Sequence, residues 1–379
     1  MKPPPPIKVI QVIARMNVGG PAILVADLMR NFDSKKVDSI LVTGYCDNNE
    51  SDYLDEVATD LKAIRLPGLG RSISPFKDLI AFFLLLREIR KFKPDVIHTH
   101  TAKAGVLGRV AGLVAAPRAK RVHTFHGHLL HGYFGSGKTQ IVILVEKLLA
   151  LSTARLVAIG NSVKKDLLEV GVGIEPKYEV IFPGLQLLQN HPKMKAREQL
   201  GLEFDKKYFV FVGRLTQIKR PDRLLDIARF LKLNYPDTQI LIAGAGELLV
   251  TIKNESDTEG LPMTFLGWRN DIDLILGAAD IAILCSDNEG IPLTLIQAAQ
   301  AGLPIISTDV GSVSDIVSHG VNGLLTETTS GGLISAAQSL LDNASMRDEF
   351  GKAGQKRAHQ YFTSEAMVKH HERLYSQIV

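Results

Sequence analysis

Cysteine is nearly absent from this sequence: among 379 residues there are two, Cys46 and Cys285. Two thiols so far apart, each in or beside an apolar run, build neither a disulfide framework nor a cysteine-based zinc site. No apolar stretch approaches the ~20 residues of a membrane span, and the segment MKPPPPIKVIQVI has a proline run where a signal peptide needs an apolar helix. We therefore expect a cytoplasmic protein, neither secreted nor transmembrane.

Acidic residues are scarce in part of the first half. Residues 1–184 hold 25 Lys and Arg against 17 Asp and Glu, and between Lys62 and Arg121 there are 13 basic residues and three acidic ones. Such a segment suits an anionic lipid surface or a phosphate-bearing acceptor, and a solvated basic face explains it equally well. The net charge of the chain is only +4, and no nucleic-acid partner is expected.

Short apolar, β-branched runs alternate with helix-length amphipathic segments, which is typical of an α/β fold with parallel sheets. The runs of the first half are IKVIQVI, DSILVTG, PDVIHTH, KRVHTF and RLVAIG. After a polar pause at Gln189–Lys195 the alternation restarts with YFVFVG, TQILIAG, MTFLG, DIAILCS and LPIIST. The length and the pause predict two doubly wound, Rossmann-like domains that meet near residue 185. Ligands of such sheets bind at the carboxyl ends of the strands, so the informative residues should follow strands.

Two glycines follow the first predicted strand, within Asn17–Pro21. Paired glycines let a ligand approach the backbone closely, and Pro21 suits the first turn of a helix whose free N–H groups can bind an anion. Gly19 and Gly20 are therefore candidate phosphate contacts. A plain connecting turn is the alternative.

Six histidines lie within 34 residues, around the ends of two predicted strands: His98, His100, His123, His126, His128 and His131. No acidic residue lies among them, and they follow strand alternation rather than the spacing of a helical zinc-binding pair. We therefore expect no metal and interpret the histidines as lining a site for phosphate or sugar.

A pair of cations follows the first strand of the second half, in FVGRLTQIKRPDRLLDIA. Arg214 ends the strand, and Lys219 lies in the loop before the next helix. Two cations near one helix start can neutralise a diphosphate leaving group, and Arg can bind it bidentately. Two solvated surface charges are the alternative.

The densest pattern is SDNEGIPLTLIQAAQAGLPIISTDV. Glu289 ends a predicted strand, where it can accept hydrogen bonds from sugar hydroxyls, and Gln297 lies eight residues further on. The turn and helix start between them can donate N–H groups to phosphate or sugar oxygens. They consist of Gly290, Ile291, Pro292 and Leu293. An acidic N-cap and a surface glutamine are the alternative interpretations.

Three further segments admit competing interpretations. Gly132–Thr139 matches the P-loop pattern, but HGHLLH separates it from the nearest strand, whereas a P-loop follows its strand directly. Asp271-Ile272-Asp273 resembles a D-x-D metal motif, and helix capping explains it better. The helical segment SPFKDLIAFFLLLREIRKFK could lie on an anionic membrane surface, but we favour burial against the sheet.

Together, the Gly-Gly turn, THTAKAGVLGR, VHTFHGH, GRLxxxK and EGIPLTLIQAAQAGLPII resemble the family-4 glycosyltransferases of GT-B fold, in order and over nearly the whole chain. The resemblance implies two Rossmann-like domains facing across a cleft: residues 1–184 on the acceptor side, and residues 185–362 binding the nucleotide sugar. It also implies that a helix at about residues 363–379 returns to the first domain.

The same resemblance implies roles for individual residues. Gly19 and Gly20 meet the donor diphosphate, His126 lies beside the reacting sugar, and Arg214 with Lys219 binds the diphosphate. The loop Trp268-Arg269-Asn270 borders the nucleobase, which makes Arg269 a candidate.

In the family's E-x7-E motif the first Glu binds sugar hydroxyls and the second binds the ribose. Glu289 matches the first, whereas Gln297 replaces the second. A neutral amide loses the charge-assisted bond to the ribose, at a cost of about 1 kcal/mol.

We therefore expect a retaining glycosyltransferase. It would move a hexosyl or N-acetylhexosaminyl group, from a UDP-sugar in the first instance, to a saccharide or lipid-linked acceptor in cell-surface polysaccharide assembly. The resemblance implies front-face attack in which the leaving phosphate assists deprotonation of the acceptor, so no protein nucleophile is needed. Neither a metal nor another cofactor is expected. The alternatives are a non-catalytic sugar-nucleotide binder, which the Gln297 replacement suggests, and a P-loop phosphotransferase. Peripheral contact with an anionic membrane is the remaining expectation about partners.

Overall fold

The computed structural model describes residues 4–48, 50–127 and 136–379. The chain divides into two compact units. Unit 1 comprises the chain up to Leu185 together with Ser364–Val379, and unit 2 comprises Gln186–Thr363. The C-terminal helix thus belongs to the unit that contains the start of the chain.

Unit 1 is built on a parallel sheet of seven strands in the order β3-β2-β1-β4-β5-β6-β7. The strands are β1 (Ile7–Ile13), β2 (Val37–Thr43), β3 (Ala63–Arg65), β4 (Val96–His100), β5 (Lys120–Phe125), β6 (Arg155–Ala158) and β7 (Tyr178–Val180). The central strands are almost wholly buried, as parallel strands covered by helices on both faces must be.

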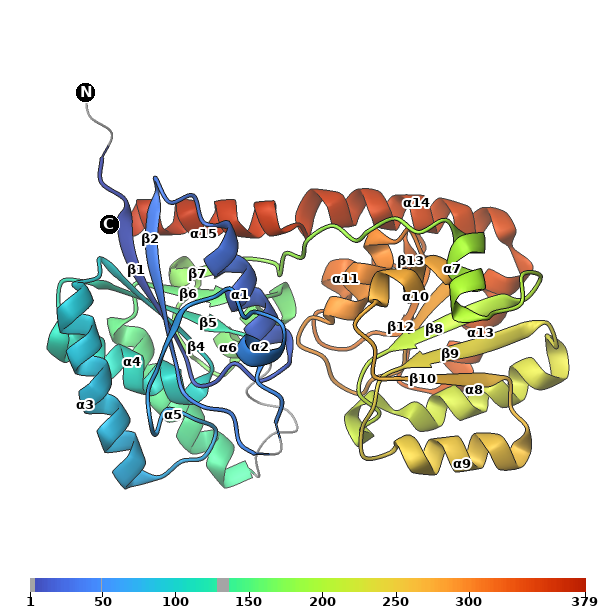
Figure 1. The fold of residues 1–379 in the computed structure, drawn as a ribbon, viewed down its shortest axis with the longest axis horizontal. Helices are drawn as coiled ribbons and strands as arrows, with labels where there is room; N and C mark the ends of the chain where they lie inside the picture. The colour runs from blue at the N-terminus through green and yellow to red at the C-terminus, as the bar shows by residue number, and fades with distance from the viewer. Residues whose placement is uncertain (1–3, 49, 128–135) are drawn as a thin grey trace. The chain divides into compact units, whose positions relative to one another are not determined.

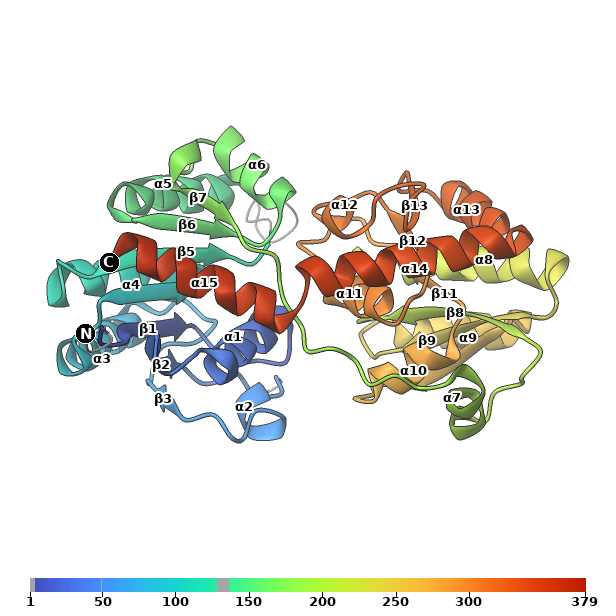
Figure 2. The ribbon, with the colours of Figure 1, turned by 90° about the horizontal axis from the view of Figure 1, so that it is seen from above.

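Helices cover both faces of this sheet (Figures 1 and 2). Helices α3, α4 and α5 form one layer, with α4 packed against both of the others, and α1 with α15 lies on the opposite face. The helices of unit 1 are α1 (Gly20–Asn31), α2 (Tyr53–Glu56), α3 (Pro75–Phe92), α4 (Ala102–Ala115), α5 (Ser136–Ser152), α6 (Asn161–Glu169) and α15 (Ser364–Ile378).

Unit 2 repeats the doubly wound plan with six parallel strands in the order β10-β9-β8-β11-β12-β13. Its strands are β8 (Lys207–Val212), β9 (Thr238–Ala243), β10 (Met263–Gly267), β11 (Ile281–Leu284), β12 (Ile305–Thr308) and β13 (Gly323–Thr326). Its helices are α7 (Lys193–Leu200), α8 (Pro221–Asn234), α9 (Leu249–Glu259), α10 (Ile272–Ala278), α11 (Leu293–Gln300), α12 (Val313–Ile316), α13 (Ser330–Asp342) and α14 (Ala344–Tyr361).

The prediction of two doubly wound α/β sheets is confirmed, and each of the ten apolar runs forms a strand. Strands β3, β7 and β13 were not predicted. All three are edge strands of three or four residues. Such strands are too short to establish a period-two or buried pattern, so hydrophobic periodicity misses them.

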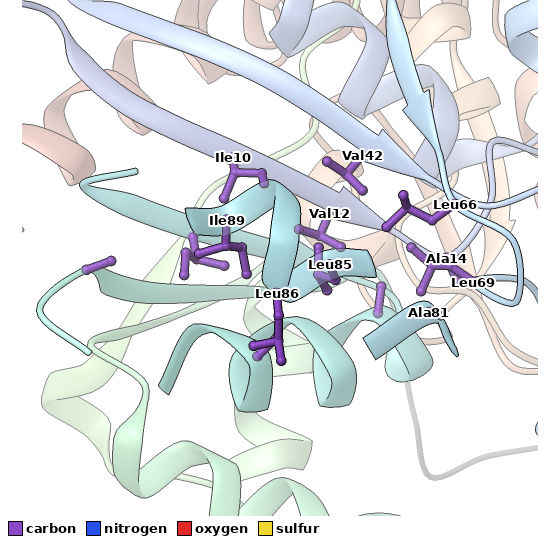
Figure 3. Packing of buried hydrophobic residues seen from close by; sticks show 14 residues of the cluster. Ile10, Val12, Ala14, Val42, Leu66, Leu69, Ala81, Leu85, Leu86 and Ile89 are labelled. Atoms are coloured by element: carbon purple, nitrogen blue, oxygen red, sulfur yellow. The ribbon is translucent and has the colours of Figure 1, made fainter. Parts of the chain in front are cut away.

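Helix α3 packs one side on the sheet and leaves the other in solvent. Leu85 and Ile89 are fully buried against Ile10 and Val12 of β1 (Figure 3). On the opposite side Phe76 and its neighbours are exposed. The prediction that this helix is buried against the sheet is therefore confirmed for most of its apolar side chains. It is wrong for Phe76, Leu79, Ile80 and Phe83, which the sheet does not reach.

The buried and exposed sides of α3 predict different effects of substitution on the free energy of unfolding. Leu85→Ala removes a fully buried side chain and should lower the free energy of unfolding by about 2–5 kcal/mol. Leu79→Ala, in the same helix but 52% exposed, should change it by less than about 0.5 kcal/mol. Urea denaturation followed by circular dichroism measures both, and equal losses in the two variants would contradict the packing described.

Candidate active site

The Gly-Gly turn, Arg214 and Glu289 follow strands at the two places where strand order reverses, whereas His126 follows β5 and Arg269 follows β10. In unit 1 the order reverses between β1 and β4, which are followed by the Asn17–Pro21 turn and by Thr101. In unit 2 it reverses between β8 and β11, which are followed by Arg214 and Glu289. Neighbouring loops leave in opposite directions at such a switch point, and the space between them binds ligands in doubly wound sheets.

The Gly-Gly turn forms the start of α1. Gly19 is the N-cap residue, Gly20 the first residue of the helix, and Pro21 lies in the first turn as predicted. The turn is fixed by the loop after β2, because Val18 donates its N–H to the carbonyl of Ser51 at 3.0 Å. The backbone at Gly19 is extended, and an added Cβ would meet only Asn17 atoms at 3.8 and 3.9 Å. Neither the backbone conformation nor the packing at position 19 thus requires glycine. The space beside this glycine leaves room for a ligand against the backbone.

Buried histidines connect the sheet of unit 1 to its C-terminal helix. His100 Nδ1 lies 2.9 Å from His126 Nε2, and its Nε2 lies 2.8 Å from Gln11 Oε1. The amide nitrogen of Gln11 donates to the hydroxyl of Tyr375 in α15 at 3.0 Å. The same hydroxyl lies 2.6 Å from Nδ1 of His98. A hydrogen-bonded chain thus runs from α15 to His126.

Strand alternation sends the other histidine to the opposite face. His123 bonds Thr99 at 2.8 Å and packs against α4, where an added Cβ on Gly105 would lie 2.6 Å from its ring. The expectation that the histidines line a ligand site is therefore wrong for His98, His100 and His123, since all three are in the interior. Of the four described histidines of the cluster, His126 alone is more than marginally exposed, while His128 and His131 lie outside the described residues.

Burial keeps these imidazoles neutral. It holds the pKa of His98, His100 and His123 well below the ordinary value near 6.5. Burial, with a smaller contribution from His371, lowers the pKa of His126 to about 3. The pKa of His371 itself, on α15, is lowered to about 4 by burial.

In unit 2, Lys219 and Glu289 meet directly. Lys219 Nζ lies 2.5 Å from Oε1 of Glu289, which also accepts a hydrogen bond from the Ser286 hydroxyl at 2.5 Å. Glu289 is only 9% exposed. A buried carboxylate needs hydrogen-bond or ion-pair partners, and Lys219 and Ser286 are the partners of Glu289. The interpretation of Glu289 as a plain N-cap is wrong, because Pro292 is the N-cap residue of α11.

The other predicted groups of unit 2 surround this pair. Arg214 is exposed, and its side chain makes no hydrogen bond or ion pair with the residues described. Helix α11 begins at Leu293, and Pro292 is its N-cap residue rather than a residue of its first turn. Gln297 is half-buried further along the same helix. The backbone at Gly290 is fixed by Ser312, which donates its N–H to the Gly290 carbonyl at 3.0 Å.

The loop before α10 is held by its own ion pairs. Arg269 forms a two-pronged pair with Asp271, and Asp273 bonds His191 at 3.1 Å. Asp271 is the N-cap residue of α10, as the capping interpretation requires, but its carboxylate binds Arg269 rather than helix N–H groups. Both carboxylates of the D-x-D segment are therefore engaged, and in the described part of the chain no His, Cys, Asp and Glu cluster is arranged to hold a metal.

Two non-glycine residues at the switch points have left-handed backbone conformations. Thr101, directly after His100, has φ of 66°, and Arg220, directly after Lys219, has φ of 49°. Such conformations cost about 1–3 kcal/mol each and occur preferentially at ligand sites. The P-loop pattern at Gly132–Thr139 lies mostly outside the described residues.

Sequence reasoning missed Gln11, Ser286 and Tyr375. Gln11 is a polar residue inside a buried apolar strand, and that signal was available in IKVIQVI. Ser286 lies directly beside the predicted strand end. Tyr375 is separated from Gln11 by 364 positions along the chain, and nothing in the local pattern connects the two.

Two doubly wound units, each with candidate ligand-binding residues at its switch point, are the architecture of the two-domain GT-B transferases. The model of the group 1 glycosyl transferases matches residues 192–357, and the glycosyltransferase family 4 model matches residues 18–187. The chain belongs to the family-4 glycosyltransferases of GT-B fold and is a glycosyltransferase, as predicted. The phosphotransferase and the non-catalytic binder are set aside.

Individual relatives agree with this assignment. The chain is 35% identical, over 73% of both sequences, to the UDP-Gal:alpha-D-GlcNAc-diphosphoundecaprenol alpha-1,3-galactosyltransferase of Escherichia coli. It is 26% identical to the O-antigen biosynthesis glycosyltransferase WbnH of Escherichia coli, over 84% of this chain and 85% of that one. The crystal structure of Anabaena HepE in complex with UDP has the same fold, with a TM-score of 0.83, 19% identity and coverage of 98% and 100%.

The neutral histidines predict the pH dependence of stability. In the unfolded chain a histidine binds a proton below about pH 6.5, whereas the five in unit 1 with depressed pKa stay neutral when folded. The unfolded state therefore binds more protons, and stability falls as pH drops below 6.5, by up to about 1.4 kcal/mol per pH unit for each histidine.

Urea midpoints measured by circular dichroism between pH 7.5 and 5.5 test this, because carboxylates barely titrate there. Fluorescence of Trp268, the only tryptophan, reports unit 2 separately. A circular dichroism midpoint that stays constant over this range would refute the neutral, buried state of the histidines.

Proposed function

We propose that this chain transfers a hexosyl or N-acetylhexosaminyl group from a UDP-sugar to a lipid-linked saccharide in cell-surface polysaccharide assembly, with retention of configuration. UDP-galactose is the first candidate donor, and a GlcNAc-diphospholipid the first candidate acceptor. The names of the curated relatives support this choice, and so does the UDP bound to the structural neighbour.

The Lys219–Glu289 pair is the observation on which the donor site depends. A lysine beside a nearly buried carboxylate places a cation and a hydrogen-bond acceptor within 2.5 Å of each other at one strand end. In the proposed reaction Lys219 and Arg214 stabilise the developing charge of the UDP leaving group. Glu289 accepts hydrogen bonds from the sugar hydroxyls, which orients the ring, while Gln297 bonds the ribose as a neutral amide.

The remaining predicted residues complete this proposal. Gly19 and Gly20 bring backbone N–H groups to the diphosphate, His126 lies beside the sugar, and the turn from Gly290 to Leu293 offers the free N–H groups of α11. Arg269 borders the base. No protein nucleophile takes part, because the leaving phosphate accepts the proton of the attacking acceptor hydroxyl on the same face of the sugar. No metal or other cofactor is assigned a role.

Substitution of the pair tests the donor site. Glu289→Gln and Lys219→Ala should each lower kcat/KM for transfer from UDP-galactose at least about 100-fold, because each removes a charged contact to the reacting donor. Transfer to a synthetic GlcNAc-diphospholipid, with UDP-glucose and UDP-GlcNAc as competing donors, gives the measurement. A thermal-shift screen against the same nucleotides reports binding independently.

The control variant is Lys253→Ala, which breaks an exposed ion pair with Asp257 on α9 and should leave transfer unchanged. Because Lys219→Ala also leaves the Glu289 carboxylate with Ser286 alone, the melting temperature of each variant is measured. Full activity in both site variants would refute the assignment of the pair.

The lipid-linked acceptor implies work at a membrane surface, and we propose that α3, α4 and α5 form the contact face. Within the described residues, no helix has the length and hydropathy needed to cross a bilayer. The outer side of α3 exposes Phe76, which is 75% exposed, and its neighbours Leu79, Ile80 and Phe83. The outer side of α5 exposes Ile141, Leu144, Leu148 and Leu151. Exposed apolar stripes on two helices of the same layer are unusual on a monomer and typical of interaction surfaces.

The charges of this face favour an anionic lipid surface over a second copy of the chain. The second half of the outer side of α3 is basic, with Arg87, Arg90 and Lys91 exposed. The acidic residues of these helices leave a net positive charge on this face. Asp78 pairs with Lys103, Glu146 is buried against Arg109, and the side chain of Glu88, 14% exposed, lies 3.9 Å from Arg87. Two such faces would repel each other, whereas anionic headgroups attract each basic residue by about 1 kcal/mol.

Vesicle flotation tests this face. The protein should bind vesicles of phosphatidylglycerol and phosphatidylethanolamine more tightly than phosphatidylcholine vesicles, and salt should weaken the binding. The triple variant Arg87→Gln, Arg90→Gln, Lys91→Gln should bind about 100-fold more weakly, and the double variant Phe76→Ser, Phe83→Ser should also lose binding. The control is Leu233→Ser, exposed on α8 of unit 2. Equal binding to both lipid mixtures, or a dimer that these substitutions dissociate, would refute lipid as the occupant.

A further inference from the structure

The hydrogen bonds that end on His126 form a chain with a direction. We call the four side chains Tyr375, Gln11, His100 and His126 the histidine relay. Consecutive members are joined at 3.0, 2.8 and 2.9 Å. All members except His126 are at most 1% exposed, so no water competes for these bonds. With the Gln11 amide oriented as in the structure, the donor and acceptor at each bond follow from chemistry.

The assignment begins at Gln11. Its amide nitrogen can only donate and its oxygen can only accept, so with the nitrogen on Tyr375 the oxygen must receive the Nε2–H of His100. A neutral imidazole has one N–H, which makes Nδ1 of His100 an acceptor. His126 must then donate from Nε2. The remaining nitrogen of His126, Nδ1, has no proton.

That remaining nitrogen is the unexplained atom of the relay. Nδ1 of His126 is shielded from solvent, and it has no hydrogen-bond partner among the residues that the structure describes. Buried acceptors are rarely left unpaired, because the loss of a hydrogen bond costs about 1–3 kcal/mol. An acceptor that the fold leaves open beside a ligand site is suited to a hydroxyl group of that ligand.

We propose that Gln11, held in one orientation by Tyr375, fixes His126 through His100 in its Nε2–H tautomer, so that the bare Nδ1 accepts a hydrogen bond from a hydroxyl of the bound sugar. Tyr375, Gln11 and His100 are positioning residues and do not touch the sugar. The contact of His126 with the sugar rests on the proposed function, whereas the tautomer does not.

The relay has one competing state, in which the Gln11 amide is reversed. Every bond of the relay then reverses with it, and His126 exposes Nδ1–H as a donor. Tyr375 selects between the states through a second contact: its hydroxyl lies 2.6 Å from Nδ1 of His98, whose Nε2 lies 2.7 Å from Thr124 Oγ1. While the tyrosine donates to His98, it can only accept from Gln11. The tyrosine donates to His98 when this imidazole carries its proton on Nε2 and donates it to Thr124 Oγ1.

Nitrogen NMR of histidine-labelled protein tests the tautomer directly. In the unsubstituted protein His126, assigned from the spectrum of His126→Gln, should have its proton on Nε2 throughout pH 6 to 8. Tyr375→Phe frees the Gln11 amide to reverse, and Gln11→Met removes it, so both variants should show a mixture of tautomers at His126. The control is Tyr178→Phe, which removes another buried hydroxyl of unit 1, bonded to the Val172 carbonyl at 2.7 Å, and should leave His126 unchanged.

Kinetics of the same variants test the sugar contact. Tyr375→Phe and Gln11→Met should lower kcat for sugar transfer about fivefold, the effect of one lost neutral hydrogen bond. KM for the donor should change less than about twofold, because the diphosphate contacts remain. A general structural defect would instead lower the melting temperature and act on Tyr178→Phe as well.

The outcomes separate the parts of the proposal. Protonation of Nδ1 in the unsubstituted protein, or one unchanged tautomer in both variants, would overturn the relay. A changed tautomer with unaltered kcat would overturn the sugar contact. If the chain transferred no sugar to any acceptor, the proposed function would fail while the NMR result still decided the relay.

Discussion

The reversal of strand order in each parallel sheet is the constraint on which the site depends. A parallel connection must cross over the sheet in a right-handed sense, so a sheet that grows from its centre in both directions places helices on opposite faces. At the reversal, neighbouring loops separate at the carboxyl edge. The Gly19–Gly20 turn follows β1 at one reversal, while Arg214 and Glu289 follow β8 and β11 at the other. The positions of these candidate site residues therefore follow from topology before any side chain is considered.

The polar interior of unit 1 departs from the apolar pattern of its sheet. Gln11 and His98 occupy neighbouring positions of β1 and β4, and Thr99 and His100 follow His98 in β4. The desolvation of Gln11 and His98 is offset because each is hydrogen-bonded to Tyr375 of α15. The C-terminal helix thus supplies a partner that the sheet alone does not have. Removing that helix would leave several buried polar groups unpaired.

The helix layer formed by α3, α4 and α5 in unit 1 has apolar side chains on its surface, whereas the sheet has polar side chains in the interior. Helices α3 and α5 use one side for the core and expose a second apolar side. Because the exposed charges on α3 are basic, the surface combines apolar insertion with attraction to anions. The proposed lipid-linked acceptor would give such a face a use, and the same layer of helices covers the sheet that carries His126.

The sequence alone was sufficient for the class of fold, for the ten main strands and for the glycosyltransferase family. Buried runs, turn glycines and strand-end motifs such as GRLxxxK are local features, so they can be recognised in the sequence. The motifs also located Lys219 and Glu289, although not their contact.

Tertiary structure alone decided which histidines are structural. Strand alternation and the packing of α15 turn His98, His100 and His123 into the interior and leave His126 at the end of a relay. The partner of Gln11 lies 364 positions away, and the exposure of Phe76 depends on what the sheet leaves uncovered. Local patterns describe neighbours along the chain, whereas burial, tautomer and ion pairing are set by neighbours in space.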